Sequence, residues 1–127
     1  SGIVEFQTDV AGSNALAENC AYVTTPSVAA LLKQRVKVAS TYSPIWEGNI
    51  LDGNVDGFKA ASTLQLTAAS MIFGDFSQVV IGEWGMLELA LNPYANFAAA
   101  ISGIRAIQTV DIGIRQAGAF SRATSIT

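Results

Sequence analysis

Two segments in the second half of the sequence determine its architecture: VVIGEWGMLELALNPY over residues 79–94 and IRAIQTVDIGI over residues 104–114. In both segments apolar side chains alternate with polar ones, and side chains two positions apart share one face of a β-strand. The apolar set comprises Val79, Ile81, Leu87, Leu89 and Leu91, and then Ile104, Ala106, Val110, Ile112 and Ile114. The pattern predicts two strands of unusual length, since most strands hold about 3–10 residues.

The two segments are expected to pair as a long antiparallel β-ribbon. The first stays extended from Gln78 to Leu91, and Asn92-Pro93-Tyr94 should end it in a tight turn. Such a ribbon reaches beyond a compact domain, which is more typical of an assembly device than of an active site. We also expect cross-strand ion pairs on its polar side. The charged residues available for them are Glu88, Arg105, Asp111 and Arg115.

The first half of the chain has a different pattern, which mixes helices with short strands. Helical spacing of apolar residues predicts a helix over residues 3–17, and Thr25-Pro26 is a clear start for a second helix. Residues 38–57 contain several Gly turns and are expected to be mostly connection. Short apolar runs predict strands over residues 20–25, 58–66, 71–73 and 120–127. The expected fold class is therefore α+β, a mixed β-sheet with two helices plus the long ribbon.

Composition indicates that part of the surface is covered by other molecules. The chain has 127 residues, enough for one domain or one domain plus an extension. Half of the residues are hydrophobic and only 13% are charged, where ordinary domains have about 25%. Such a chain cannot cover its outside with charge, which favours contact with copies of itself, a homo-oligomer, or with other proteins.

Several functions are excluded or disfavoured by the residues present. The sequence has no His, which excludes a Ser-His-Asp triad, and its single Cys20 excludes a disulfide framework or a multi-Cys metal site. A net charge of −3 with scattered basic residues disfavours a nucleic-acid site, and the apolar runs are too short to span a membrane. We therefore predict no catalytic residue, no cofactor and no metal, and a protein that is not an enzyme.

Two alternatives from other classes stay open at this stage. A small carboxylate-dependent hydrolase would need two acidic residues to converge in a pocket. Its candidates are Asp75, Glu83, Glu88 and Asp111. A ligand-binding or adhesion β module would instead act as a monomer.

The candidate contact residues are aromatic or charged side chains in the irregular middle segment and on the ribbon. Trp46 is either an interface anchor or packed beneath its own loop, and Trp84 lies on the polar side of a long strand. The full set of expected assembly contacts is Trp46, Glu47, Trp84, Glu88, Arg105 and Arg115.

Five blocks, taken in order, resemble the major capsid proteins of tailed bacteriophages. They are AYVTTPSV (21–28), WEGN (46–49) with Gly57-Phe58, IFGDFSQVVI (72–81) with Trp84-Gly85, NPY (92–94) and the alternating strand over 104–114. The resemblance covers nearly the whole chain. It implies the Hong Kong 97-type shell fold, in which an axial domain of mixed sheet and helices is joined to a peripheral domain.

On this resemblance, residues 1–75 are expected to be axial-domain-like, and residues 76–127 to be long ribbon strands that link the axial and peripheral domains. The N-terminal arm, extended loop and spine helix of the family have no counterpart here, so the chain is expected to be a C-terminal portion of a longer subunit. Ala98-Ala99-Ala100 stands where relatives carry a crosslinking Asn, and no crosslink is predicted.

The function that the resemblance implies is a structural subunit of a phage or prophage icosahedral capsid, acting through self-assembly contacts. The expected partners are other capsid subunits, with scaffold or portal proteins as further ones, and no nucleic-acid site or membrane. The expected location is the virion, with assembly in the bacterial host cytoplasm. The alternative within the same fold is an encapsulin-like shell of a bacterial compartment.

Overall fold

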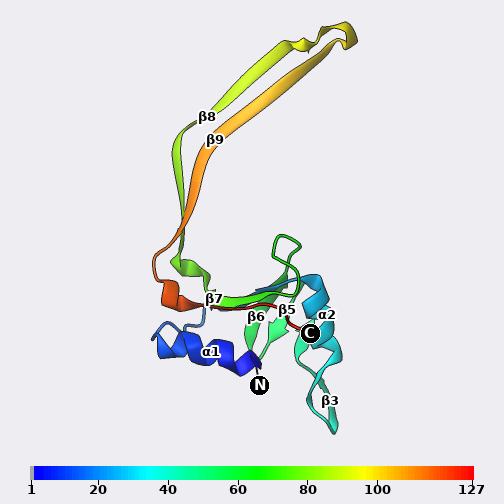
Figure 1. The fold of residues 1–127 in the computed structure, drawn as a ribbon, viewed down its shortest axis with the longest axis vertical. Helices are drawn as coiled ribbons and strands as arrows, with labels where there is room; N and C mark the ends of the chain where they lie inside the picture. The colour runs from blue at the N-terminus through cyan, green and yellow to red at the C-terminus, as the bar shows by residue number, and fades with distance from the viewer. Residues whose placement is uncertain (1) are drawn as a thin grey trace. The chain divides into compact units, whose positions relative to one another are not determined.

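The computed structural model describes residues 2–127, and it combines two α-helices with ten strands in three sheets (Figure 1). The helices are α1 (Gly2–Gly12) and α2 (Pro26–Gln34). The strands are β1 (Cys20–Thr24), β2 (Val36–Val38), β3 (Thr41–Pro44), β4 (Trp46–Gly48), β5 (Asp52–Val55), β6 (Phe58–Ser62), β7 (Met71–Asp75), β8 (Val79–Asn96), β9 (Ile101–Ile114) and β10 (Phe120–Ala123). The predicted α+β class, a mixed sheet with two helices and a long ribbon, is confirmed.

The chain forms two units, one around a six-stranded sheet and one consisting of the ribbon. The first unit holds residues up to Gln78 together with Arg115–Thr127, and the second holds Val79–Ile114. The expected division into residues 1–75 and 76–127 differs from these units at the C-terminal end. Residues after 114 join the first unit because β10 pairs with β7.

The sheet of the first unit has the strand order β10-β7-β1-β6-β5-β4. Only β1 and β6 pair in parallel, and the other neighbours are antiparallel. A parallel pair needs a crossover connection, and α2 lies in the stretch that joins β1 to the later strands. The mixed sheet therefore follows from the order of the elements in the sequence.

The core of the first unit lies between this sheet and the two helices. In β1 the burial alternates, so that Cys20, Tyr22 and Thr24 point into the core. The Tyr22 ring lies 4.4 Å from the Phe73 ring and 6.1 Å from the Phe6 ring, measured between centroids. Because Phe6 belongs to α1, and Val28 of α2 is part of the same buried cluster, both helices pack on one hydrophobic core.

Trp46 is buried in this core and has no exposed surface. Its indole Nε1 donates a hydrogen bond to the Asn49 carbonyl oxygen at 2.7 Å. The Trp46 ring leaves no room for a side chain at Gly53 on the neighbouring strand, since a Cβ at Gly53 would lie 2.7 Å from the Trp46 Nε1 atom. Of the two predictions for Trp46, packing beneath its own loop is the one observed, and the prediction of an assembly contact is wrong.

Several predicted boundaries differ from the structure. The first helix ends at Gly12 rather than at residue 17, because the chain turns at Asn14 with a φ of 53°, a conformation that ends helices. The strand expected over 58–66 ends at Ser62, which pairs with Thr24 at the end of β1, and its pairing with β5 ends one residue earlier, at Ala61. Leu64 lies beyond the sheet and is exposed.

The segment 38–57 is predicted to be mostly connection, but it contains β3, β4, β5 and the last residue of β2. β2 and β3 form a separate hairpin, and β4 and β5 complete one edge of the main sheet. Strands this short carry few alternating residues, and their pairing comes from the turns between them. The signals for those turns, such as Asp52-Gly53 and Asp56-Gly57, were visible in the sequence.

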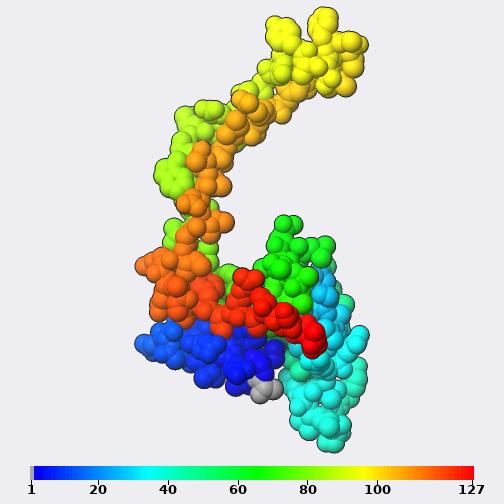
Figure 2. All heavy atoms as spheres, in the orientation of Figure 1, coloured from blue at the N-terminus to red at the C-terminus, as the bar shows by residue number. Residues whose placement is uncertain are grey.

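The second unit is the two-stranded antiparallel ribbon of β8 and β9. Figure 2 draws its atoms in yellow-green to orange. The register pairs Val79 with Ile114 at one end and Asn96 with Ile101 at the other. The expected turn at residues 92–94 is wrong in position, because β8 continues to Asn96 and the tip is a short 3-10 turn over Phe97–Ala99.

Candidate assembly surface

The register of the ribbon gathers the apolar residues of both strands on one face, as the alternation predicted. Ile81 lies opposite Ile112, and Leu91 opposite Ile104. We call this the apolar ribbon face, and it comprises Val79, Ile81, Leu89, Leu91, Ile104, Ala106, Val110, Ile112 and Ile114. Exposed fractions of 64% for Ile81, 76% for Ile104 and 65% for Ile112 show that it is uncovered in a single chain. Large exposed apolar patches mark interaction sites.

The opposite side, the polar ribbon face, carries three of the six predicted contact residues, Trp84, Glu88 and Arg105. It comprises Trp84, Glu88, Asn92, Arg105, Thr109 and Asp111. Trp84 is 56% exposed, and its indole lies over Gly82, where a Cβ would be 3.2 Å from the ring. Glu88, Arg105 and Arg115 are exposed as well. All four side chains are therefore available to a neighbouring molecule, and their role as assembly contacts stays a prediction.

The expected ion pairs between these charges are not formed in the single chain. Across residues 2–127, the salt bridge present joins Lys37 Nζ to Glu47 Oε1 at 2.8 Å. Arg105 stands opposite Ala90 and Asp111 opposite Gly82, so neither stands directly across the ribbon from an opposite charge. The prediction of cross-strand pairs between Arg105 or Arg115 and Glu88 or Asp111 is therefore wrong.

The remaining predicted contact residue, Glu47, lies on β4 at the edge of the first unit's sheet. Its side chain is 55% exposed, and its carboxylate is the partner of Lys37. The neighbouring hairpin of β2 and β3 carries an exposed aromatic residue that the sequence reasoning did not select, Tyr42, with 91% of its surface exposed. Tyr42 lies in the segment 38–57, which is predicted to be mostly connection.

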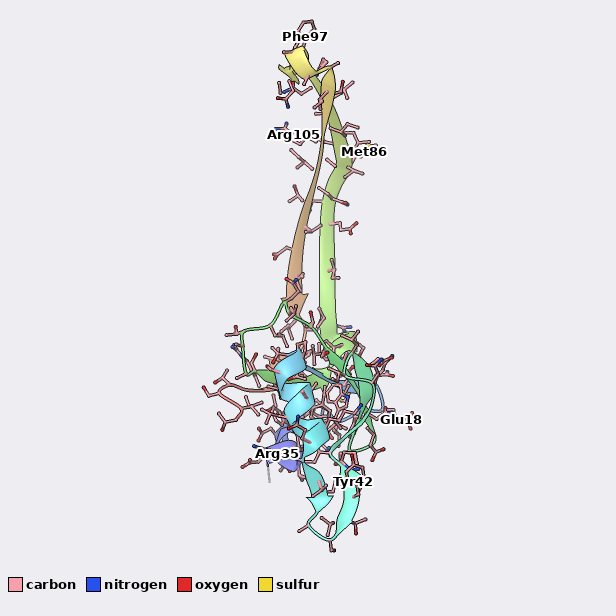
Figure 3. All side chains as sticks on the ribbon, turned by 90° about the vertical axis from the view of Figure 1, so that its right-hand side faces the viewer. Glu18, Arg35, Tyr42, Met86, Phe97 and Arg105 are labelled. Atoms are coloured by element: carbon pink, nitrogen blue, oxygen red, sulfur yellow. The ribbon has the colours of Figure 1, made fainter. Side chains whose placement is uncertain are left out.

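Irregularities in β8 expose further apolar side chains. Between Trp84 and Glu88 the register shifts, and Gly85 adopts a φ of 72°, so that a bulge forms. Met86 in this bulge is 88% exposed, and Phe97 at the ribbon tip is 81% exposed. Figure 3 shows both side chains, and that of Arg105, projecting outward from the ribbon.

Two of the carboxylates proposed for a hydrolase, Glu83 and Asp111, do not form a paired site on the ribbon. Glu83 stands opposite Val110 and accepts a hydrogen bond from Gln108 Nε2 at 3.1 Å. Asp111 stands opposite Gly82, one position away, and therefore points to the other face. Two carboxylates on opposite faces of one ribbon cannot act on the same bond.

Asp75 lies in the first unit, at the end of β7, and has a local structural role. Its carboxylate Oδ1 accepts hydrogen bonds from the Ser77 hydroxyl at 2.7 Å and from the Ser77 backbone N–H at 3.0 Å. These two bonds hold the pKa of Asp75 below its ordinary value of 3.8, against a smaller opposing effect of burial. The ionised side chain thus fixes the turn between β7 and the ribbon.

This turn should make the stability of the first unit sensitive to acid. Because the pKa of Asp75 is lowered in the folded state, its contribution to stability is present above pH 3.8 and is lost as the pH falls through the folded-state pKa. We expect the Tm difference between the wild type and Asp75→Asn to shrink from about pH 6 to about pH 3. Thermal unfolding followed by circular dichroism measures this, and equal differences at both pH values would contradict it.

A groove of about 380 Å³ lies between α1, α2 and β10 in the first unit. Its floor is apolar, with Phe6, Leu32 and Met71, and its rim carries Arg35, whose guanidinium donates to the Thr127 carbonyl oxygen at 2.5 Å. Among the described residues no group of three or more Cys, Asp and Glu side chains is placed to hold a metal ion. None of the helices described is both long and apolar enough to span a membrane.

Residues 7–124 match the model of the phage capsid family, and the chain belongs to this family. The predicted resemblance to phage major capsid proteins is thereby confirmed. The match favours a structural capsid protein over the encapsulin-like alternative.

Two relatives show how the chain compares with longer proteins. It is 30% identical over 118 residues to the major capsid protein of Halomonas phage phiHAP-1, an alignment that covers 93% of this chain and 19% of that protein. It is similar in structure to a chain from the capsid of an empty GTA particle, with a TM-score of 0.61 and 16% identity, over 97% of this chain and 40% of that one. The chain thus spans less than half the length of both relatives.

Proposed function

We propose that this chain is a structural part of a phage or prophage capsid, and that it acts by contacts between subunits rather than by catalysis. The observation that carries the proposal is the apolar ribbon face, which is exposed along both strands in a protein of the phage capsid family. A ribbon of two strands is only marginally stable alone in water, and it gains stability when its apolar face is covered. Neighbouring subunits would provide that cover.

The contact residues of this proposal are exposed side chains of the ribbon and of the residue that follows it. Trp84, Glu88 and Arg105 would contact neighbours at the polar ribbon face, and Arg115 would do so from the first unit. The apolar ribbon face would supply most of the buried area. The location would be the virion, after assembly in the host cytoplasm. Scaffold and portal proteins are the further partners that such a shell would require.

A lysine on the apolar ribbon face should prevent self-association of the chain. Ile112 is 65% exposed, so Ile112→Lys leaves the folded chain intact, yet a neighbour would have to bury the new charge. We expect the wild type to sediment as oligomers at high concentration, and the variant to dissociate at least about tenfold more readily. Analytical ultracentrifugation over a concentration series measures this.

The matched control is Thr8→Lys, which adds the same charge at an exposed position of α1 in the first unit, away from the ribbon. It should sediment like the wild type. A wild-type chain that stays monomeric at all concentrations would contradict the proposal, as would equal effects of the two lysines.

A further inference from the structure

The two outer edges of the ribbon differ in a way that concerns assembly. Within the described structure β8 and β9 form a two-stranded sheet, so each strand has one edge of backbone N–H and C=O groups without a strand partner. Both register shifts lie in β8, where residues 85–87 and 93–95 each stand opposite a single residue of β9. Bulges and prolines such as Pro93 are the devices by which proteins keep an edge from pairing.

The edge of β9 has none of these devices. Its 14 residues from Ile101 to Ile114 include no proline and no lysine, and none of them has a positive φ. A long, regular and open edge is a template for another strand, because it presents its hydrogen-bonding groups at even intervals. The bulges and Pro93 hinder the edge of β8 from pairing with another strand, whereas the regular edge of β9 can accept one.

The charges of β9 indicate which strand would fit. Arg105 and Asp111 are its charged residues, and both lie on the polar ribbon face. Neither takes part in an ion pair within residues 2–127, and the Asp111 carboxylate accepts a hydrogen bond only from the adjacent Ile112 backbone N–H, at 2.8 Å. Gln108 lies midway between these two residues in the sequence. When two copies of the strand run antiparallel with Gln108 at the centre, Arg105 of each copy therefore faces Asp111 of the other.

We propose that β9 pairs antiparallel with β9 of a second copy of this chain, about a twofold axis at Gln108. In this register Arg105 of each copy stands opposite Asp111 of the other, which forms two ion pairs between copies. On the apolar ribbon face, Ile104 stands opposite Ile112. The two ribbons become one four-stranded sheet whose apolar faces join on the same side. This inference deepens the proposed function, since it names one of the subunit contacts on which that function rests.

Other registers do not give this complementarity. With the axis at Ile107, Arg105 would stand opposite Thr109, and with the axis at Thr109 it would stand opposite Gly113. In neither case does Asp111 face a charge. A slip by one residue would place the apolar side chains of one copy beside the polar ones of the other.

Charge reversal tests the pairing. Arg105→Glu places two acidic residues opposite each other across the axis, and Asp111→Arg places two basic ones, so each variant alone should dimerise at least about tenfold more weakly than the wild type. Mixing the two variants in equal amounts should restore the dimer, because each Glu then faces an Arg. Lys59→Glu, an exposed change of the same charge in the first unit, should leave dimerisation unchanged.

A cysteine at the axis tests the register directly. In the proposed pair, residue 108 of one copy stands opposite residue 108 of the other, at a spacing that a disulfide can bridge. We expect oxidised Gln108→Cys to form a covalent dimer, and Ala106→Cys, whose nearest counterpart is Val110, to remain uncrosslinked. Circular dichroism of each variant confirms that it is folded.

The outcomes separate this inference from the proposed function. A mixture of the charge variants that stays as weak as each variant alone overturns the β9 pairing, and so does equal crosslinking at positions 106 and 108. If the chain still self-associates in that case, and Ile112→Lys still abolishes the association, the structural role stands while the β9 contact does not. A wild-type chain that is monomeric throughout overturns both.

Discussion

Replacing Trp46 by alanine should lower the free energy of unfolding of the first unit by about 3–5 kcal/mol, the usual cost of removing a large aromatic side chain from a packed core. The Trp46 side chain has no exposed surface and belongs to the same buried cluster as Tyr22 and Phe73. Its loss would also leave the Asn49 carbonyl oxygen without the indole donor. Since whole domains are stable by only about 5–15 kcal/mol, the variant should be partly unfolded at ordinary temperature.

The matched control is Trp84→Ala, which removes the same side chain from the ribbon. Trp84 is 56% exposed and contacts Gly82 of its own strand, so its removal should cost the first unit less than about 1 kcal/mol. Urea unfolding followed by circular dichroism compares the two variants. Equal losses would show that Trp46 does not have the central packing role inferred from its burial.

These two tryptophans illustrate how far the sequence could predict the structure. Trp84 lies in a long strand with an alternating pattern, and its position in that pattern predicted the side of the ribbon that it occupies. Trp46 lies in a strand of three residues, too short to show a period. Its burial depends on β5 and on the close approach at Gly53, and such contacts between segments do not appear in a local pattern.

The charged residues of the ribbon show a second limit. Alternation placed Arg105 and Asp111 on the same face, but it could not give the register between β8 and β9. The bulge at residues 85–87 inserts two extra residues into β8, and the charges then stand opposite Ala90 and Gly82. The periodicity of each strand is a local property, whereas the pairing of charges depends on how the two strands are aligned.

The sequence predicted best those parts of the candidate surface where the same residue pattern repeats over many positions. Along the apolar ribbon face most alternate residues are aliphatic, and the interruptions at Glu83 and Gln108 do not hide the pattern. The absence of His and the single Cys were equally plain, because composition needs no structure for its interpretation. Properties that arise where distant segments meet, such as the packing of Tyr22 against Phe6 and Phe73, could not be predicted from local patterns.

Excision of the ribbon should leave the first unit folded and abolish self-association through β8 and β9. The Arg115 backbone N–H already donates to the Gln78 carbonyl oxygen at 2.9 Å, so a two-residue Asn-Gly turn can join these two residues in place of residues 79–114. All members of the main buried cluster lie outside the excised segment. Unfolding of the shortened chain should therefore stay cooperative, with a free energy within about 2 kcal/mol of the full chain.

This excision separates folding from assembly in one experiment, because the ribbon contributes apolar area that the single chain does not bury. Its removal should lower the exposed apolar surface, and the shortened chain should bind less of a hydrophobic dye and sediment as a monomer. Replacing only the ribbon tip, residues 93–100, by the same turn is the control, since it leaves most of the apolar ribbon face in place. A shortened chain that unfolds without cooperativity would show that the first unit needs the ribbon to fold. One that still associates like the full chain would place the main subunit contact on the first unit, with the exposed Tyr42 hairpin as the next candidate.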